Sequence, residues 1–407
     1  MCCLKAGIRR FEVLSNSERV EFGKEYGWEI SNTGLEVALH GVRSVTSHDL
    51  VLHAYALALT KKTKVSDEMM ALDCDVSIEN AKQLIKDYEE FKTKRGKYDF
   101  TDMLTEAVGK GPIGAKIVMV DEAQDLTPLQ LDLVRELSGG ADYLYLAGDD
   151  DQAIYTFQGA NELGFLNFAC DEEIILERSH RVPQEIGSRA AVTITKVEHR
   201  HIKGSSWSET TGKIHMANDW TSLPWEKMDG RDTFVLCRHR AQVEKTMEYL
   251  KSIGIVAYSG DDDPVSAEYR EALQIFKHHK LQGRELTNLD WSKVFKGVGR
   301  KIEAAQIRKN ISVRKDVTWK DFKKNPYYEL IKENPMRKPT IHVGTMHWSK
   351  GREADIVVLL SDCNYRVYRA MNDTERRLCY VAMTRARKHL FICQPESRHY
   401  LEPLLEV

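Results

Sequence analysis

The sequence lacks any apolar run approaching the roughly 18 to 20 residues of a membrane-spanning helix, and its first residues lack the apolar core of a secretory signal. Its eight cysteines include no C-x-x-C pair and are scattered like the free thiols of a cytosolic protein. Proline is scarce, at 10 of 407 residues, and with 25 glycines the composition excludes collagen-like and low-complexity chains. We therefore expect a soluble, cytoplasmic protein of several domains.

An excess of charge of one sign is also missing from the chain as a whole. The 59 Lys and Arg against 61 Asp and Glu give a formal net charge of -2, which excludes a uniformly basic coat for nucleic acid. A local excess is present, because residues 277–338 hold 17 Lys and Arg against 7 Asp and Glu. The aromatic residues interleaved with these charges are Trp291, Trp319, Phe322, Tyr327 and Tyr328. Such a stretch suits nucleic-acid contact, but a small helical domain with an aromatic core and a solvated charged face explains it equally well.

Short apolar runs alternate with helical patterns through the middle and the end of the chain. Strands are predicted at 116–120, 142–147, 173–176, 233–237, 340–343, 356–360 and 389–393, and the first has the length and β-branching of a buried strand. A helix is predicted between Thr127, its N-cap, and the stop at Gly139-Gly140. This order predicts an α/β fold with parallel sheets, whose ligand sites lie at the carboxyl ends of the strands.

Two carboxylates, Asp121 and Glu122, directly follow the first predicted strand. An aspartate there can hold Mg²⁺ on a nucleotide, and a glutamate can orient the attacking water. Two surface carboxylates would be the simpler explanation if the pair stood alone. However, residues 120–125 read VDEAQD, and residues 147–160 read AGDDDQAIYTFQGA. The sequence thereby resembles the UvrD/Rep family of superfamily 1 DNA helicases, whose motifs II and III have these residue patterns in this order.

Four further segments extend the resemblance. They are DFTDML at 99–104, LERSHR at 176–181 (motif IV), VGTMHWSKGRE at 343–353 (motif V) and ERRLCYVAMTRA at 375–386 (motif VI). The resemblance implies an α/β protein with two RecA-like P-loop NTPase lobes, the first incomplete, and helical accessory insertions. It implies an insert of the first lobe at 1–95 and part of that lobe at 96–180. The second lobe would comprise 181–258 and 340–407, with a short basic insert at 259–339.

The resemblance also implies an activity, namely an ATP-dependent helicase or translocase moving 3′ to 5′ on single-stranded or forked DNA. The implied catalytic residues are Asp121 (as the Mg²⁺ ligand), Glu122, Gln152, Arg181 and Arg385. The implied nucleotide contacts are Gln124, Asp149, His180, Gly351 and Glu353. The implied contacts to single-stranded DNA are Tyr155, Phe157, Thr345 and His347. Core packing is the alternative for the two aromatic residues, as it is for the histidine.

Some positions depart from the family pattern. His180 stands where the family usually has tyrosine, Phe157 where tryptophan is common, Gln158 where arginine is common, and Trp348 where a small residue is usual. His180 predicts looser purine selectivity. The insert at 259–339 is shorter than the family's second accessory domain, which predicts altered handling of duplex DNA without loss of motor chemistry.

The family's phosphate cradle, G-x-x-x-x-G-K-[ST], is absent from the 407 residues. The nearest candidate, 109–116, has the wrong spacing and is predicted to be a turn, while residues 1–8 resemble the tail of a motif Ib helix. We therefore expect Met1 to be an internal start, a separate N-terminal piece to carry the P-loop, and the chain alone to hydrolyse little ATP. The alternative is a non-catalytic DNA-binding or regulatory remnant of such a helicase.

Overall fold

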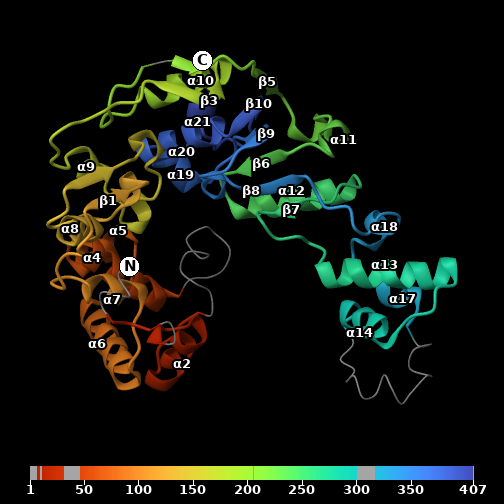
Figure 1. The fold of residues 1–407 in the computed structure, drawn as a ribbon, viewed down its shortest axis with the longest axis horizontal. Helices are drawn as coiled ribbons and strands as arrows, with labels where there is room; N and C mark the ends of the chain where they lie inside the picture. The colour runs from red at the N-terminus through yellow and green to blue at the C-terminus, as the bar shows by residue number, and fades with distance from the viewer. Residues whose placement is uncertain (1–6, 10–11, 32–45, 205, 300–316, 407) are drawn as a thin grey trace.

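The computed structural model describes residues 7–9, 12–31, 46–204, 206–299 and 317–406, so most of the predicted motif Ib tail lies outside the described residues. The protein is a mixed α/β structure with parallel sheets (Figure 1). Within the described part, no helix combines the length and apolar character that crossing a membrane would require.

The N-terminal part of the described chain is helical, as its polar helical pattern predicts. Its helices are α2 (Asn16–Tyr26), α4 (Ser47–Lys61), α5 (Val65–Ala71), α6 (Ile78–Arg95) and α7 (Phe100–Thr105). Apolar residues of α2, α4 and α6 form one core, in which Phe22, Leu84 and Phe91 are fully buried.

The first sheet consists of two parallel strands, β1 (Ile117–Val120) and β2 (Tyr143–Leu146). The helix predicted between them is confirmed as α8 (Pro128–Leu137), with Thr127 and Gln130 forming a capping box at its start. The short elements that follow are η2 (Ala123–Asp125), η3 (Asp150–Gln152), η4 (Thr156–Gln158) and α9 (Glu162–Leu166).

No described segment covers one face of this first sheet, which corrects the prediction that the strand at 116–120 is buried. Side chains alternate between the faces of a strand, and one face presents the exposed side chains of Ile117, Met119, Tyr143 and Tyr145. The strand predicted at 173–176 is also wrong. That segment pairs with no strand among the described residues, and Ile174 and Leu176 are exposed on it.

The second sheet has six parallel strands in the order β5-β10-β9-β6-β8-β7. Their bounds are β5 (Lys213–Ala217), β6 (Thr233–Cys237), β7 (Tyr258–Ser259), β8 (Ile341–Thr345), β9 (Ala354–Leu360) and β10 (Ala386–Cys393). The four later strands of the prediction are therefore confirmed as β6, β8, β9 and β10. A separate parallel pair is formed by β3 (Arg178–Pro183) and β4 (Ser206–Ser208).

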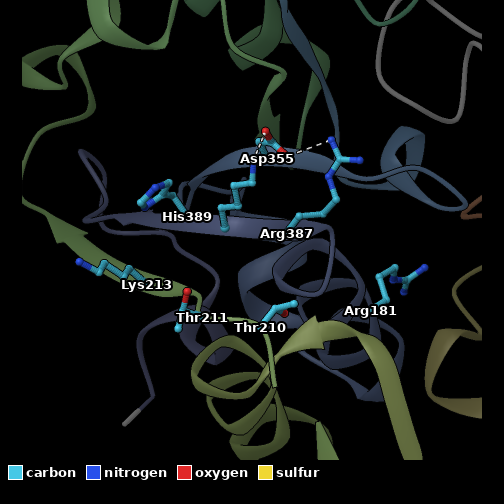
Figure 2. Close-up of a pocket in the computed structure, with 8 residues that line it drawn as sticks. Arg181, Thr210, Thr211, Lys213, Asp355, Arg387 and His389 are labelled. Atoms are coloured by element: carbon cyan, nitrogen blue, oxygen red, sulfur yellow. Dashed lines mark hydrogen bonds and ion pairs between the residues drawn. The ribbon is translucent and has the colours of Figure 1, made fainter. Parts of the chain in front are cut away.

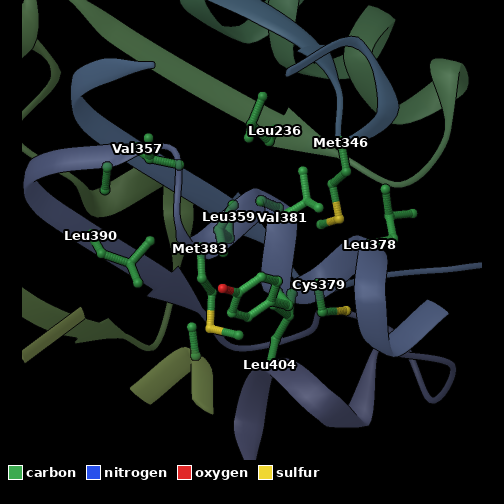
Figure 3. Close-up of a cluster of buried hydrophobic side chains, with 14 of the residues drawn as sticks. Leu236, Met346, Val357, Leu359, Leu378, Cys379, Val381, Met383, Leu390 and Leu404 are labelled. Atoms are coloured by element: carbon green, nitrogen blue, oxygen red, sulfur yellow. The ribbon is translucent and has the colours of Figure 1, made fainter. Parts of the chain in front are cut away.

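Alternate residues of the central strands enter two different cores, as expected for a parallel sheet covered on both faces. Phe234, Val357 and Leu390 pack with helices α10 (Gln184–Ile194) and α20 (Asp373–Met383), and Figure 3 shows part of this core. Val235 and Val358 pack on the opposite face, where α12 (Arg240–Ser252) and α11 (Trp225–Met228) lie. The remaining elements of this region are η5 (Trp220–Ser222), η6 (His347–Ser349), α19 (Tyr365–Arg369) and α21 (Glu402–Leu405).

The basic stretch forms a separate small helical unit, seen on the right of Figure 1. Its helices are α13 (Ala267–Gln282), α14 (Asn288–Gly297), α17 (Trp319–Phe322) and α18 (Tyr328–Ile331). Trp291, Phe322 and Tyr328 are buried in its core, and Trp319 and Tyr327 pack against them. The structure thus favours the aromatic-core explanation, because these rings are used for packing and are not displayed for base stacking.

Candidate functional site

The carboxyl ends of β1 and β2 are joined through one buried amide, that of Gln124. Its Nε2 donates a hydrogen bond of 2.6 Å to Glu122 Oε2, and its Oε1 accepts one of 2.8 Å from the backbone N–H of Asp149. Gly148 permits this approach, since a Cβ there would lie 2.7 Å from Gln124 Oε1. Asp121 is exposed beside the amide, and its Oδ1 accepts a bond of 2.9 Å from the Glu122 N–H.

Gln152, in the segment after β2, lies where the part of the molecule that contains the first sheet (the first part) meets the part that contains the six-stranded sheet (the second part). Its Nε2 donates to Asp149 Oδ2 at 2.5 Å, while its Oε1 accepts from Arg385 Nη2 at 3.4 Å. Its backbone oxygen accepts from Lys350 Nζ at 2.8 Å. A glutamine of the first part is therefore contacted by two cations that follow β8 and α20 of the second part.

Arg385 is a buried cation without a carboxylate partner. Its side chain donates to the backbone oxygen of Val381 at 2.9 Å and to Thr384 Oγ1 at 3.1 Å, and no carboxylate lies within ion-pair distance in the described chain. Burial lowers the pKa of Arg385 to about 10, and the nearby charge of Arg181 adds to this effect. A buried guanidinium of this kind favours an anion next to it.

The predicted nucleotide contacts of the second part lie around the two arginines. Arg181 is partly exposed and its nearest acid is Glu353, at 3.8 Å, which also accepts from Arg387 at 3.3 Å. His180 is exposed on β3, and Gly351 is in a left-handed turn with φ 74°. The structure therefore groups Glu122, Gln124, Asp149, Gln152 and Arg385 by direct contacts, while Asp121 and His180 stay at the edge.

An open cavity of about 780 Å³ lies beside Arg181 (Figure 2). Its other lining residues are Thr210, Thr211, Lys213, Asp355, Arg387, Lys388 and His389. Part of its positive charge is compensated, because Asp355 accepts from Lys388 at 2.8 Å and lies 3.0 Å from Arg387.

Three cations of the site were missed by the sequence reasoning. Lys203 Nζ contacts the carboxylates of Asp149, Asp150 and Asp151 together. Burial would raise the pKa of Asp149, but the charge of Lys203 and hydrogen bonds to Asp149 lower it below its ordinary value. The other two cations are Arg200, which binds Asp151 through two bonds of 2.7 and 2.8 Å, and Lys350, which pairs with Asp125. Only the motif V string could have pointed to Lys350, and no linear pattern pairs residue 200 with residue 151.

A groove of about 600 Å³ lies next to this polar cluster. It is lined by Tyr155, Gln158, Arg240, Val243, Ser259, Gly260, Asp261, Asp262, Val343, Gly344, Thr345, His347 and Trp348. Three of the four predicted DNA contacts thus line one cavity. The fourth, Phe157, packs edge-on against His347 with ring centroids 5.5 Å apart. The Lys350 ammonium lies 4.9 Å from the centroid of Tyr155, so the groove and the polar cluster share a side chain.

Comparison with known proteins identifies the family. Residues 46–173 match the UvrD/REP helicase N-terminal domain, and residues 267–397 match the UvrD-like helicase C-terminal domain, together well over half of the chain. The chain belongs to the UvrD-type helicases. Its parallel sheets are accordingly those of RecA-like helicase lobes, as the predicted fold class has them.

Two relatives illustrate the extent of the similarity of this UvrD-type chain. The ATP-dependent DNA helicase UvrD2 of Mycobacterium tuberculosis is 25% identical over 342 residues, covering 69% of this chain and 47% of UvrD2. The ATP-dependent DNA helicase PcrA of Staphylococcus aureus is 35% identical over 103 residues, covering 24% of this chain and 14% of PcrA. The chain therefore spans less than half the length of these curated relatives.

Proposed function

We propose that this chain forms most of the motor of an ATP-dependent DNA helicase that moves 3′ to 5′ on single-stranded DNA and opens forked duplexes. The observation that carries this proposal is the buried guanidinium of Arg385, which lies against Gln152 and has no carboxylate partner among the residues that the structure describes. A γ-phosphate is an anion that would compensate this charge, and the second arginine, Arg181, is close enough to influence its pKa.

The residues at the end of β1 fit a magnesium nucleotide. No group of three or more His, Cys, Asp or Glu side chains able to hold a metal occurs in the described ranges. Mg²⁺ in phosphoryl-transfer sites, however, uses one or two carboxylates together with phosphates and water. The exposed Asp121 is suited to that role. Bound Mg·ATP would supply the transferable phosphoryl group and part of its charge neutralisation.

The chain's own residues then have separate tasks in this proposal. Glu122, held by Gln124, orients the attacking water. Gln152 belongs to the first lobe and contacts both Asp149 and Arg385, and so can report whether a γ-phosphate is present. Lys350 contacts both the Gln152 backbone and the Tyr155 ring, which provides a direct link from the nucleotide to the DNA groove. Movement of the lobes on hydrolysis would thereby shift the bound strand.

We further propose that a separate N-terminal polypeptide supplies the phosphate cradle. The absence of G-x-x-x-x-G-K-[ST] from the sequence supports this, as does the uncovered apolar face of β1 and β2 beside Asp121. Parallel strands are normally covered on both faces. The predicted division into two lobes, with accessory inserts at 1–95 and 259–339, is part of the same proposal.

The test is ATP turnover measured with and without a single-stranded oligonucleotide. We expect background turnover from the chain alone, and DNA-stimulated turnover when a segment bearing a G-x-x-x-x-G-K-T loop is co-expressed. Robust turnover by the chain alone would contradict the need for that segment. The missing cradle also favours a second function, a non-catalytic DNA-binding remnant. That function holds if the segment co-purifies with the chain and turnover still stays at background.

A further inference from the structure

The linker that leads from β7 into the basic insert forms a wall of the groove. Ser259, Gly260, Asp261 and Asp262 line the same cavity as Tyr155 and the other predicted DNA contacts. Two carboxylates in a groove for a DNA backbone are unexpected, because they repel phosphates. Their role depends on the proposed binding of DNA in this groove.

Within the described residues, only one of these two carboxylates has a cationic partner. Asp261 accepts two hydrogen bonds from the guanidinium of Arg352, at 3.1 Å from Nη1 and 2.8 Å from Nη2, and a third at 3.3 Å from Trp348 Nε1. The guanidinium also lies 4.7 Å from the centroid of the Trp348 ring. The side chain of Asp262 forms no ion pair in the described part of the chain, although it lines the same groove.

The contact between Asp261 and Arg352 has the geometry of a phosphate contact. A planar guanidinium binds two oxygens of a carboxylate or of a phosphate with the same paired N–H groups. Trp348 holds the guanidinium from its ring face and donates to the same carboxylate, so the acceptor position is fixed on two sides. Both partners are also partly exposed, with 42% of the Arg352 side chain and 59% of the Asp261 side chain accessible. Exposed ion pairs are weak, so a competing anion can replace the carboxylate.

We propose that Asp261 occupies a phosphate-binding position on Arg352, and that a single strand entering the groove displaces it. Arg352 then binds a backbone phosphate, with Trp348 beside it. The displaced linker continues into Asp263, which pairs with Arg270 of α13 at 3.0 Å. Entry of DNA therefore loosens one attachment of the insert, and the groove controls how firmly the insert is held.

The experiment compares Asp261→Asn with Asp262→Asn, two changes that remove the same charge from the same groove. Binding of a fluorescent oligo-dT is measured over a series of salt concentrations. Both variants remove a carboxylate that repels the DNA phosphates, but only Asp261→Asn also frees Arg352. We therefore expect Asp261→Asn to tighten oligo-dT binding several-fold more than Asp262→Asn does. In an Arg352→Gln background the two changes should become equal. Arg352→Gln alone should reduce the slope of log affinity against log salt by about 0.7, the value for one phosphate contact on a single strand.

Each outcome decides a different point. Equal effects of the two aspartate changes in the wild-type background, or weaker binding by Asp261→Asn with an unchanged melting temperature, would overturn the displacement. A salt slope unaffected by Arg352→Gln would show that this arginine does not bind phosphate. Failure of the unmodified chain to bind oligo-dT at all would instead remove the proposed DNA groove, and the Arg352 position with it.

A second measurement follows the linker itself. Ser259 and Asp262 exchange backbone hydrogen bonds of 3.0 and 3.1 Å. Displacement of Asp261 should make these amides exchange faster with deuterium when oligo-dT is bound. Slower exchange would show that DNA tightens the linker and would contradict the proposal.

Discussion

The ammonium of Lys350 donates a hydrogen bond of 2.8 Å to the backbone oxygen of Gln152, so a lysine following β8 contacts the segment that follows β2. The same ammonium pairs with Asp125, which is largely buried. Burial raises the pKa of Asp125 even though Lys350 lies beside it. One contact between the segments that follow β2 and β8 is therefore made by a lysine whose removal leaves a carboxylate without its partner.

Lys350→Met should lower the free energy of unfolding by about 2–4 kcal/mol, because it leaves a mostly buried carboxylate without a partner. Urea titration monitored by tryptophan fluorescence provides the measurement. The matched control is Lys293→Met, which removes an exposed partner of Glu271 and should cost less than about 1 kcal/mol. Equal losses in the two variants would show that Lys350 is not an internal support.

Arg385→Gln should abolish stabilisation by anions. In the unchanged protein, an anion next to the buried guanidinium compensates its charge, so sulfate should raise the melting temperature more than chloride of equal ionic strength. Arg385→Gln should reduce this difference to the general effect that sulfate has on any folded protein, and, without sulfate, should leave stability within about 1 kcal/mol, since it also removes an uncompensated charge. Arg366→Gln, at an exposed arginine on α19, controls for general salt effects. A sulfate effect in Arg385→Gln as large as in the unchanged protein would place the anion elsewhere.

Acid should destabilise the protein through His239. Burial, with a contribution from Arg238, lowers the pKa of His239 to about 4, and its Nε2 accepts a hydrogen bond of 2.9 Å from the Asn364 N–H. The folded state thus favours the neutral ring, so this stabilisation is complete above the unfolded pKa of about 6.5 and is lost as the pH falls toward 4.

The expected loss is about 1 kcal/mol after allowance for the partial exposure of His239. His239→Gln keeps an acceptor for Asn364 and should reduce the slope of stability against pH between 6.5 and 4. The slope should not vanish, because burial also lowers the pKa of His53 to about 4. An identical slope in the variant and the parent would exclude His239 as a contributor.

Met119→Lys should reduce self-association, because Met119 belongs to the uncovered apolar face of β1 and β2 and is 76% exposed. Met70→Lys is the matched control: Met70 is 78% exposed on α5 and lies outside that face. Light scattering against protein concentration should show fewer large species for Met119→Lys alone. If both changes reduce self-association equally, the added net charge is the cause, and the apolar face of β1 and β2 does not mediate self-association.

The sequence predicted elements well where the decisive contacts are local. The helix at 128–137 carries its own capping residues, Thr127 and Gln130, and the strand at 233–237 was placed to the residue. Prediction failed at 173–176, because an apolar run forms a strand only if another strand lies beside it. It also failed to foresee that one face of β1 is uncovered, since burial depends on what packs against a strand.

The distinction between local contacts and contacts made only on folding also applies to the site. Residues inside a recognisable string, such as Glu122 and Gln152, could be assigned a role from the sequence. Lys203 and Arg200 could not, because they meet the aspartates at 149–151 only after the chain has folded through α9, β3 and α10. The aromatic residues at 291–328 left two explanations open, which the burial of their rings separates.

Arg270 shows how the insert is joined to the second lobe. Its side chain binds Asp263, where the chain enters the insert, and donates bonds of 2.9 Å to the backbone oxygens of Pro335 and Arg337, where the chain leaves it. Entry and exit are therefore neighbours in space, although some seventy residues separate them along the chain. In topological terms the insert is a module that a short turn could replace, leaving the order of the six strands unbroken.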